Sequence, residues 1–279
     1  MPAPLTPASI RALLDAYGLR PSRALGQHFL ADPNTADRIV RLAGVSPGDR
    51  VVEVGPGLGS LTVALCAAGA SVTAVELDRH VVRALEDVVA DLPVRIEVGD
   101  ALTVDWRELL GDEAGWSMVA NLPYNVATSM VVRALETAPM IDRFLVMVQR
   151  EVGERLAAPP GSRTYGAVSV RVAYYAQARV IGHVPPTVFM PRPNVDSALV
   201  QLLRRSAPPV EVADVDRMFT IVRAGFATRR KTLRRALAPL LGDRTVAVLE
   251  RAGIDSSARA ETLGLPEWAA LADADAGDR

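Results

Sequence analysis

The sequence has few of the residues that build disulfides and metal sites. Its 279 residues include one cysteine, Cys66, and three histidines, His28, His80 and His183. A single cysteine forms no disulfide within the chain and supports no cysteine-based metal centre. No ligand pattern surrounds His80 or His183, so we expect surface or capping roles for both and no metal site. This usage is compatible with a reducing compartment, and we expect a cytoplasmic protein.

Long apolar runs are also missing. None approaches the length needed to span a bilayer, and the N-terminus lacks the charged-then-apolar pattern of a signal peptide. Hydrophobic residues make up 49% and charged residues 23% of the chain, as in ordinary globular proteins. We expect one large and one small domain, no membrane association and, since no surplus apolar stripe needs covering, a monomer.

The chain as a whole has almost no net charge, but one stretch carries an excess of positive charge. The net charge is -1, which by itself says nothing about nucleic acid. A single-sign cluster nevertheless binds phosphate through its local field, although a solvated helix face would look similar. One stretch carries six basic residues with no acidic residue among them: Arg223, Arg229, Arg230, Lys231, Arg234 and Arg235.

Residues 50–148 alternate between strand-like and helix-like segments. The strand-like segments are β-branched and apolar on both faces, which is typical of a parallel sheet covered by helices on both sides. The expected strands are 50–54, 71–76, 94–98, 117–121 and 144–148, and the expected helices are 60–68, 79–90, 106–110 and 127–137. Strands at 178–184 and 197–204 would complete a mostly parallel seven-stranded sheet with an antiparallel edge.

Both ends of the chain look helical. We expect a helix at 7–17, a basic turn-rich arm at 18–26 and a helix at 33–43 that Asp32 caps. The sequence SAPP at 206–209 predicts a linker. Helices are expected after it at 214–226, 230–241, 245–252 and 266–272. The predicted fold is therefore an α/β, Rossmann-like domain over residues 1–205 and a small all-α domain over residues 206–279.

The segment VVEVGPGLG at residues 51–59 runs from a strand into a glycine-rich turn. Such a turn lets the backbone approach a ligand closely, but alone it fits a dinucleotide site, a methyltransferase site or a tight connection. Ser60 stands where the dinucleotide fingerprint needs a third glycine. Glu53, inside the strand, is unsuited to a pyrophosphate. A carboxylate here suits a ligand with ammonium and sulfonium charges, such as S-adenosylmethionine.

Acidic residues also follow the next two strands. Glu76 ends its strand where a carboxylate accepts both ribose hydroxyls, and Asp100 can accept the adenine amino group. A lone acidic residue at such a place is more often a helix cap, and NAD would also use Glu76. Three of them at the ends of successive strands favour a nucleoside site.

The most specific stretch is NLPY at residues 121–124. An exocyclic amine of adenine is a poor nucleophile because its lone pair is delocalised, and acceptors around its hydrogens favour the rehybridised, reactive form. The Asn121 side-chain oxygen and the Leu122 carbonyl can supply those acceptors, while Pro123 fixes the backbone. Tyr124 can stack on a flipped base. The competing interpretation is a simple strand-ending turn.

In this order the motifs resemble the ribosomal RNA adenine dimethyltransferase family over nearly the whole chain, although no single piece is decisive. The segments that carry the resemblance are 25–30 (LGQHFL), 53–57 (EVGPG), 75–78 (VELD), 99–101 (GDA), 121–124 (NLPY), 165–166 (YG), 184–197 (VPPTVFMPRPNVDS) and 226–234 (FATRRKTLR). His28 and Ala120 depart from the family, in which Asn and Gly are common at these positions.

The resemblance implies a class I methyltransferase fold that binds S-adenosylmethionine and methylates two adjacent adenines near the 3′ end of small-subunit rRNA within an assembling subunit. The cofactor-binding residues that the resemblance implies are His28, Leu30, Gly55, Glu76, Asp100 and Asn121. We also expect Gln27, Glu53, Gly57 and Ala101 at the cofactor site. The resemblance implies that Asn121 and Tyr124 form the catalytic pocket, with Phe189 facing the base opposite Tyr124, and we expect Leu122 and Pro123 beside them. Without the resemblance, Phe189 in its proline-rich loop could equally be a packing anchor. The basic stretch would bind RNA.

Three other functions stay open from the sequence. A large-subunit adenine methyltransferase of the antibiotic-resistance type would share the cofactor site and the stacking tyrosine. A ribosome-assembly factor could keep the fold without the chemistry, although it would have no need of Asn121 or Tyr124. A nicotinamide oxidoreductase is disfavoured by Ser60 and by the lack of a hydride-transfer constellation.

Overall fold

The computed structural model describes residues 3–22, 25–228 and 230–277. The chain falls into two compact units. The first comprises Met1–Gly153 and Ala178–Arg204, and the second comprises Glu154–Gln177 and Arg205–Arg279. Within the described residues, no helix is both long enough and apolar enough to cross a membrane.

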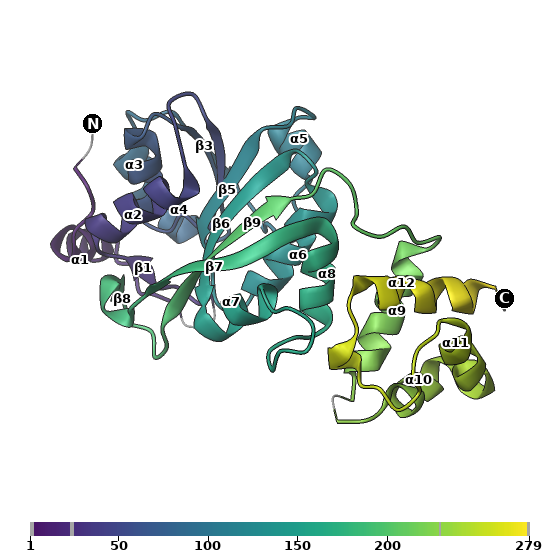
Figure 1. Cartoon of the computed structure of the whole chain (residues 1–279). Coiled ribbons are helices and arrows are strands. Elements are labelled where there is room, and N and C mark those ends of the chain that lie inside the picture. Colours follow the sequence, from purple (N-terminus) through teal and green to yellow (C-terminus); the bar gives the residue numbers. More distant parts are fainter. Residues whose placement is uncertain (1–2, 23–24, 229, 278–279) are drawn as a thin grey trace. The chain divides into compact units, whose positions relative to one another are not determined.

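The first unit is built on a seven-stranded sheet of order β4-β3-β2-β5-β6-β9-β7 (Figure 1). Neighbours among β2 to β6 pair in parallel, and β9 runs antiparallel to β6. The predicted mostly parallel sheet with an antiparallel edge is confirmed. The strands are β2 (Arg50–Val54), β3 (Ser71–Glu76), β4 (Val94–Val98), β5 (Trp116–Asn121), β6 (Ile141–Gln149), β7 (Ala176–Val184) and β9 (Ser197–Arg204).

Helices alternate with the parallel strands because each strand presents apolar side chains on both faces. Asp32, Asp78 and Asp105 cap three of these helices by accepting backbone N–H groups of the first turn. The helices are α2 (Pro33–Ala43), α3 (Ser60–Ala67), α4 (Arg79–Val89), α5 (Trp106–Leu110) and α6 (Ala127–Thr137). All five lie within two residues of their predicted positions.

The N-terminal arm is held by a second, two-stranded sheet that the sequence pattern does not predict. Here β1 (Phe29–Leu30) pairs antiparallel with β8 (Phe189–Met190), so that Leu30 lies opposite Phe189. Before it, α1 (Pro7–Ala16) buries Ile10 in a cluster with Phe29 and Leu58. Helix α1 and residues 29–30 are therefore part of the packed structure beside the turn after β2. Residues 23–24 of the predicted arm lie outside the described residues.

The second unit is helical and takes in more of the chain than a single boundary at residue 206 predicts. Its helices are α8 (Ala167–Tyr175), α9 (Val215–Phe226), α10 (Leu233–Leu241), α11 (Thr245–Arg251) and α12 (Leu265–Ala276), with the end of α7 (Arg150–Leu156). Residues 154–177 belong to it because Tyr165, Val170 and Tyr174 pack into the core around Phe219 and Trp268. The segments of α7 and α8 were not predicted to be helical.

A buried ion cluster lies in this helical unit. Asp275 is fully buried, and its carboxylate lies 2.6 Å from Arg217 Nε and 3.0 Å from a guanidinium nitrogen of Arg244. Burial alone would raise the pKa of Asp275, but the hydrogen bond and charge of Arg217, with help from Arg244, hold it below its ordinary value. The cluster ties α12 to α9 and to the turn before α11.

We predict that Asp275→Ala destabilises the helical unit by about 3 kcal/mol, because it leaves the largely buried Arg217 without its counter-charge. Since the folded pKa is lowered, the wild-type contribution is present above an unfolded-state pKa of about 4 and is lost as the pH falls through the folded value. Urea unfolding followed by circular dichroism at neutral pH and at about pH 3 measures both effects. The exposed Asp243→Ala is the matched control, and equal midpoints for the two variants would contradict the prediction.

Candidate active site

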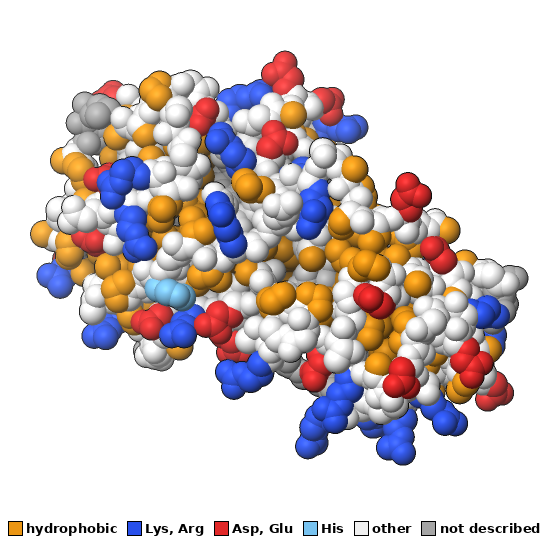
Figure 2. Space-filling model, in the orientation of Figure 1, with side chains coloured by type: hydrophobic (Ala, Val, Ile, Leu, Met, Phe, Trp, Pro, Cys, Tyr) orange, Lys and Arg blue, Asp and Glu red, His pale blue; other side chains and the backbone are white. Residues whose placement is uncertain are grey.

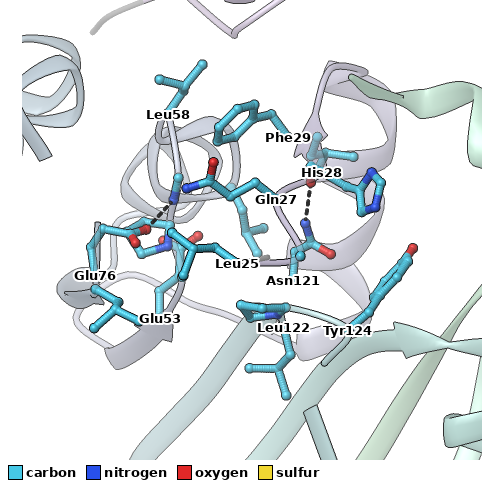
Figure 3. A pocket seen from close by; sticks show the side chains of 18 of the residues that line it. Leu25, Gln27, His28, Phe29, Glu53, Leu58, Glu76, Asn121, Leu122 and Tyr124 are labelled. Carbon is cyan, nitrogen blue, oxygen red and sulfur yellow. Dashed lines mark hydrogen bonds between the residues drawn. The ribbon is translucent and has the colours of Figure 1, made fainter. Parts of the chain in front are cut away.

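A cavity opens at the carboxyl ends of β2, β3 and β5, where ligands bind in open α/β sheets. Four segments line it: the arm at 25–30, the turn at 53–61, the end of β3 at 76–77, and the segment 121–126 after β5. Figure 3 shows Glu53 and Glu76 together at one end and Asn121 with Tyr124 at the other. Carboxylates at one end thus face an amide and an aromatic ring at the other.

The turn after β2 needs glycine at residue 57. Gly57 has a φ of 56°, and a Cβ atom there would lie 2.8 Å from the Phe29 ring. Its N–H donates to Glu76 over 3.1 Å. The missing side chain therefore allows Phe29 of the arm and the end of β3 to approach the same peptide.

The Glu76 carboxylate is held in place by backbone groups. One oxygen accepts from Gly57 N–H, and the other accepts from Asp78 N–H at 2.9 Å. Burial raises the pKa of Glu76, while these backbone hydrogen bonds act in the opposite direction. The carboxylate is thus oriented at the edge of the cavity, as a ribose-binding group must be.

Glu53 is buried in β2 with an exposed fraction of 1%. Thr62 donates its hydroxyl hydrogen to the carboxylate over 2.6 Å. Burial raises the pKa of Glu53 to about 8, the Thr62 hydrogen bond lowers it in part, and the charge of Glu76 adds to the rise. Near neutral pH the carboxyl group therefore keeps its proton unless a positive charge lies beside it.

The arm crosses the cavity and is fastened at both sides. Gln27 donates to Asp78 over 2.8 Å and accepts from the N–H of Ser22 over 2.7 Å. On the opposite side the Asn121 amide donates to the His28 carbonyl over 3.0 Å. Because Asn121 ends β5 and Asp78 lies two residues after β3, the arm and the sheet edge enclose the cavity together.

The segment after β5 places acceptors next to an aromatic face. The Asn121 nitrogen is engaged by His28, so its side-chain oxygen is directed toward the space beside Tyr124 (Figure 3). The Tyr124 ring lies with its centroid 5.3 Å from that of His28, at an interplanar angle of 34°. Leu122 is buried, which holds the backbone of this segment against the sheet. The arrangement can bind a planar group that carries an amine at its edge.

The structure brings most of the predicted site residues to the cavity lining: Gln27, His28, Leu30, Glu53, Gly55, Gly57, Glu76, Asn121, Leu122, Pro123 and Tyr124. Three predicted residues lie elsewhere. Asp100 is exposed and accepts the N–H of Leu102 at 2.9 Å, as a turn cap does, and Ala101 is buried beside it. Phe189 is 5% exposed and packs in the core next to Leu30, so it is a packing anchor in this structure.

Two polar residues at the site were not predicted. Asp78 both caps α4 and accepts from Gln27, and Ser197 forms a hydrogen bond of 2.7 Å with the Tyr124 hydroxyl. Asp78 lies two residues after Glu76, the last residue of β3, and this position was the available signal. Ser197 ends the 184–197 segment, but the sequence did not indicate its partner, because only the fold brings β9 beside Tyr124.

The basic stretch lies in the helical unit, and Arg229 is outside the described residues. Arg230 and Lys231 are exposed in the turn between α9 and α10, and Arg234 and Arg235 are exposed on α10. Arg223 is exposed on α9 and donates to Thr220. Figure 2 shows lysine and arginine side chains gathered along the edge of this unit near α10. The described members are thus all exposed to solvent.

Comparison with known proteins adds an independent line of evidence. The family model described as ribosomal RNA adenine dimethylase matches residues 19–274. A protein of Thermobifida fusca named ribosomal RNA small subunit methyltransferase A is 49% identical, with 96% of this chain and 95% of that protein covered. Its namesake from Streptomyces coelicolor is 49% identical, with 96% of each chain covered.

Among solved structures, the 23S rRNA methyltransferase ErmE superposes with a TM-score of 0.67 at 26% identity, covering 88% of this chain and 98% of its own. Together with the match of the family model, these findings show that the chain belongs to the ribosomal RNA adenine dimethylase family.

Proposed function

We propose that this protein transfers methyl groups from S-adenosylmethionine to the N6 amines of two adjacent adenines near the 3′ end of small-subunit rRNA. The product is N6,N6-dimethyladenosine. The observation that carries the proposal is the 49% identity, over nearly the full chain, to proteins named ribosomal RNA small subunit methyltransferase A. The cavity supports it, because Asn121 and Tyr124 face the same space as Glu53 and Glu76.

The residues at the carboxylate end fit S-adenosylmethionine, which supplies a methyl group on a positively charged sulfur. Glu76 is oriented to accept from ribose hydroxyls. Glu53 is a buried carboxyl group that a neighbouring cation would turn into a carboxylate. Leu58 and Leu77 add apolar surface to the lining. Two carboxylates with apolar walls match a nucleoside that carries a cationic tail.

At the other end, Asn121 and Tyr124 would hold the adenine. The free oxygen of the Asn121 amide and the Leu122 carbonyl accept hydrogen bonds from the N6 amine, which favours the reactive, rehybridised form. Tyr124 stacks on the flipped base. No strong general base is required, because the methylated amine is cationic and releases its proton to water.

The helical unit would bind the rRNA through Arg223, Arg230, Lys231, Arg234 and Arg235, whose side chains are exposed. Arg229 completes this set in the sequence. We place the reaction in the cytoplasm, on an assembling small subunit, with the protein acting as a monomer. A large-subunit substrate is less favoured, since the identity to ErmE is 26% against 49% to the small-subunit enzymes.

The direct test is methyl transfer from labelled S-adenosylmethionine to purified small subunits that lack the adenine dimethylation. We expect label on small subunits, approaching four methyl groups on two adjacent adenines, and none on large subunits or naked RNA. Asn121→Ala should lower transfer by at least about 100-fold, since it removes an oriented acceptor, while subunit binding persists. Label on large subunits would assign the protein to the resistance type.

Cofactor binding should depend on pH through Glu53. Because the free carboxyl group keeps its proton up to about pH 8 and a cation binds the ionised form, affinity for S-adenosylmethionine should rise with pH and level off above that value. The slope should reach up to about tenfold per pH unit. Calorimetric titration of wild type, Glu53→Gln and the exposed control Glu86→Gln measures it. The prediction fails if Glu53→Gln keeps the wild-type slope, since the cofactor's own titration is common to all three.

RNA binding should depend on salt through the basic stretch. Charge reversal at Arg230 and Lys231 should weaken binding and reduce the slope of log affinity against log salt by about one for each phosphate group that the protein no longer neutralises. Filter binding to small-subunit rRNA over a salt series measures the slope. Reversal of Arg83 and Arg133, exposed arginines of the first unit, is the matched control. An unchanged slope in the Arg230 and Lys231 variant would remove these residues from the proposed RNA-binding surface.

A further inference from the structure

The Tyr124 side chain is anchored at its far end. Its hydroxyl group forms a hydrogen bond of 2.7 Å with Ser197 Oγ. Ser197 is fully buried as the first residue of β9, where it pairs with Gln149 of β6. The partner of the tyrosine hydroxyl therefore belongs to the central sheet. Its buried, strand-paired position keeps it fixed if the tyrosine ring moves.

The backbone that carries Tyr124 is less constrained. Residues 122–126 form neither helix nor strand between β5 and α6. A tyrosine ring in such a segment rotates about two side-chain bonds unless a contact fixes it. The bond to Ser197 is such a contact, and it joins a turn residue to the most regular part of the fold.

The segment that leads into β9 also holds the neighbouring ring. His28 Nδ1 lies 2.8 Å from the Pro191 carbonyl oxygen. Since a carbonyl oxygen only accepts, Nδ1 must be the protonated nitrogen that donates. Pro191 and Ser197, six residues apart in the segment that leads into β9, thus bind two rings whose centroids are 5.3 Å apart. Both rings line the cavity.

We propose that Ser197 is a positioning residue for the methyl transfer: it holds the Tyr124 ring at the angle at which the target adenine stacks. The inference rests on the function proposed above. Ser197 does not touch the base, and it acts only through the tyrosine hydroxyl. This assigns a task to the end of the 184–197 motif, whose Phe189 is buried in the core.

The chemical state of the tyrosine is consistent with this task. Burial raises the pKa of Tyr124, although the hydrogen bond to Ser197 lowers it in part. The ring therefore stays an uncharged phenol at neutral pH and retains a hydroxyl hydrogen for the bond. A neutral, fixed ring is a suitable stacking partner for a neutral base.

The test is a double-mutant cycle of Ser197→Ala and Tyr124→Phe, with kcat and KM measured on small subunits that lack the dimethylation. Each single variant should lower kcat roughly fivefold, the factor that corresponds to the net contribution of one hydrogen bond. The double variant should be no slower than the singles, because both changes remove the same bond. Affinity for S-adenosylmethionine should stay at the wild-type value in all three.

Stability is controlled with Ser169→Ala, which removes another buried serine, one whose hydroxyl donates to the Arg155 carbonyl and accepts from Gly166 N–H. This variant should lose thermal stability and keep the wild-type kcat. Tyr124→Phe retains the ring and leaves Ser197 in place, so it reports on the bond even if Ser197→Ala folds poorly.

The proposal for Ser197 would be overturned if the loss of kcat in the double variant equalled the product of the two single losses, or if either single variant kept the wild-type kcat. The proposed function would stand in both cases. A wild-type protein that binds S-adenosylmethionine but methylates none of the subunits would overturn both.

Discussion

The hydrogen bond from the Asn121 amide to the His28 carbonyl is the contact on which the site depends. It joins the end of a central strand to the N-terminal arm over 3.0 Å and so closes one side of the cavity. It also fixes the orientation of the amide, because the nitrogen, which carries the donor hydrogens of that group, faces the His28 carbonyl oxygen. The oxygen is left for an incoming amine, so one contact both encloses the cavity and directs its acceptor.

The closed cavity also affects the ionisation of its two buried carboxyl groups. Glu53 and Glu76 lie in a part of the cavity where burial opposes ionisation, and for Glu53 the Thr62 hydroxyl offsets this in part. Without a ligand, Glu53 avoids a buried negative charge by keeping its proton. A bound cation stabilises the ionised carboxylate, so ionisation of Glu53 is coupled to binding of the cation. Selectivity for a positively charged nucleoside follows from burial as much as from shape.

The sheet could be predicted from the sequence because its signals are local. Apolar β-branched segments, glycine-rich turns and aspartate caps each act over a few residues, and β2, β3 and β4 have the predicted bounds. Contacts that depend on tertiary structure were missed. The strand pair β1–β8 involves two residues on each side, α8 has β-branched apolar residues that hide its helical period, and Ser197 gains its partner only when β9 reaches Tyr124. Asp100 was placed in the site from its position after a strand, and Phe189 by resemblance. In the structure the Asp100 side chain caps a turn and the Phe189 side chain packs in the core.

These contacts indicate which part of the reaction barrier the protein lowers. The cavity lining offers acceptors, carboxylates and rings, and its His28 donates from Nδ1 to a backbone carbonyl. Methylation of an amine makes its proton acidic, so the reaction needs orientation more than it needs a base. Orientation is what the fold supplies: the arm is fastened at Gln27 and His28, and the tyrosine ring is tied to the sheet. A protein that works in this way loses rate when a ring or amide is allowed to turn, even if every group that touches the substrate is still present.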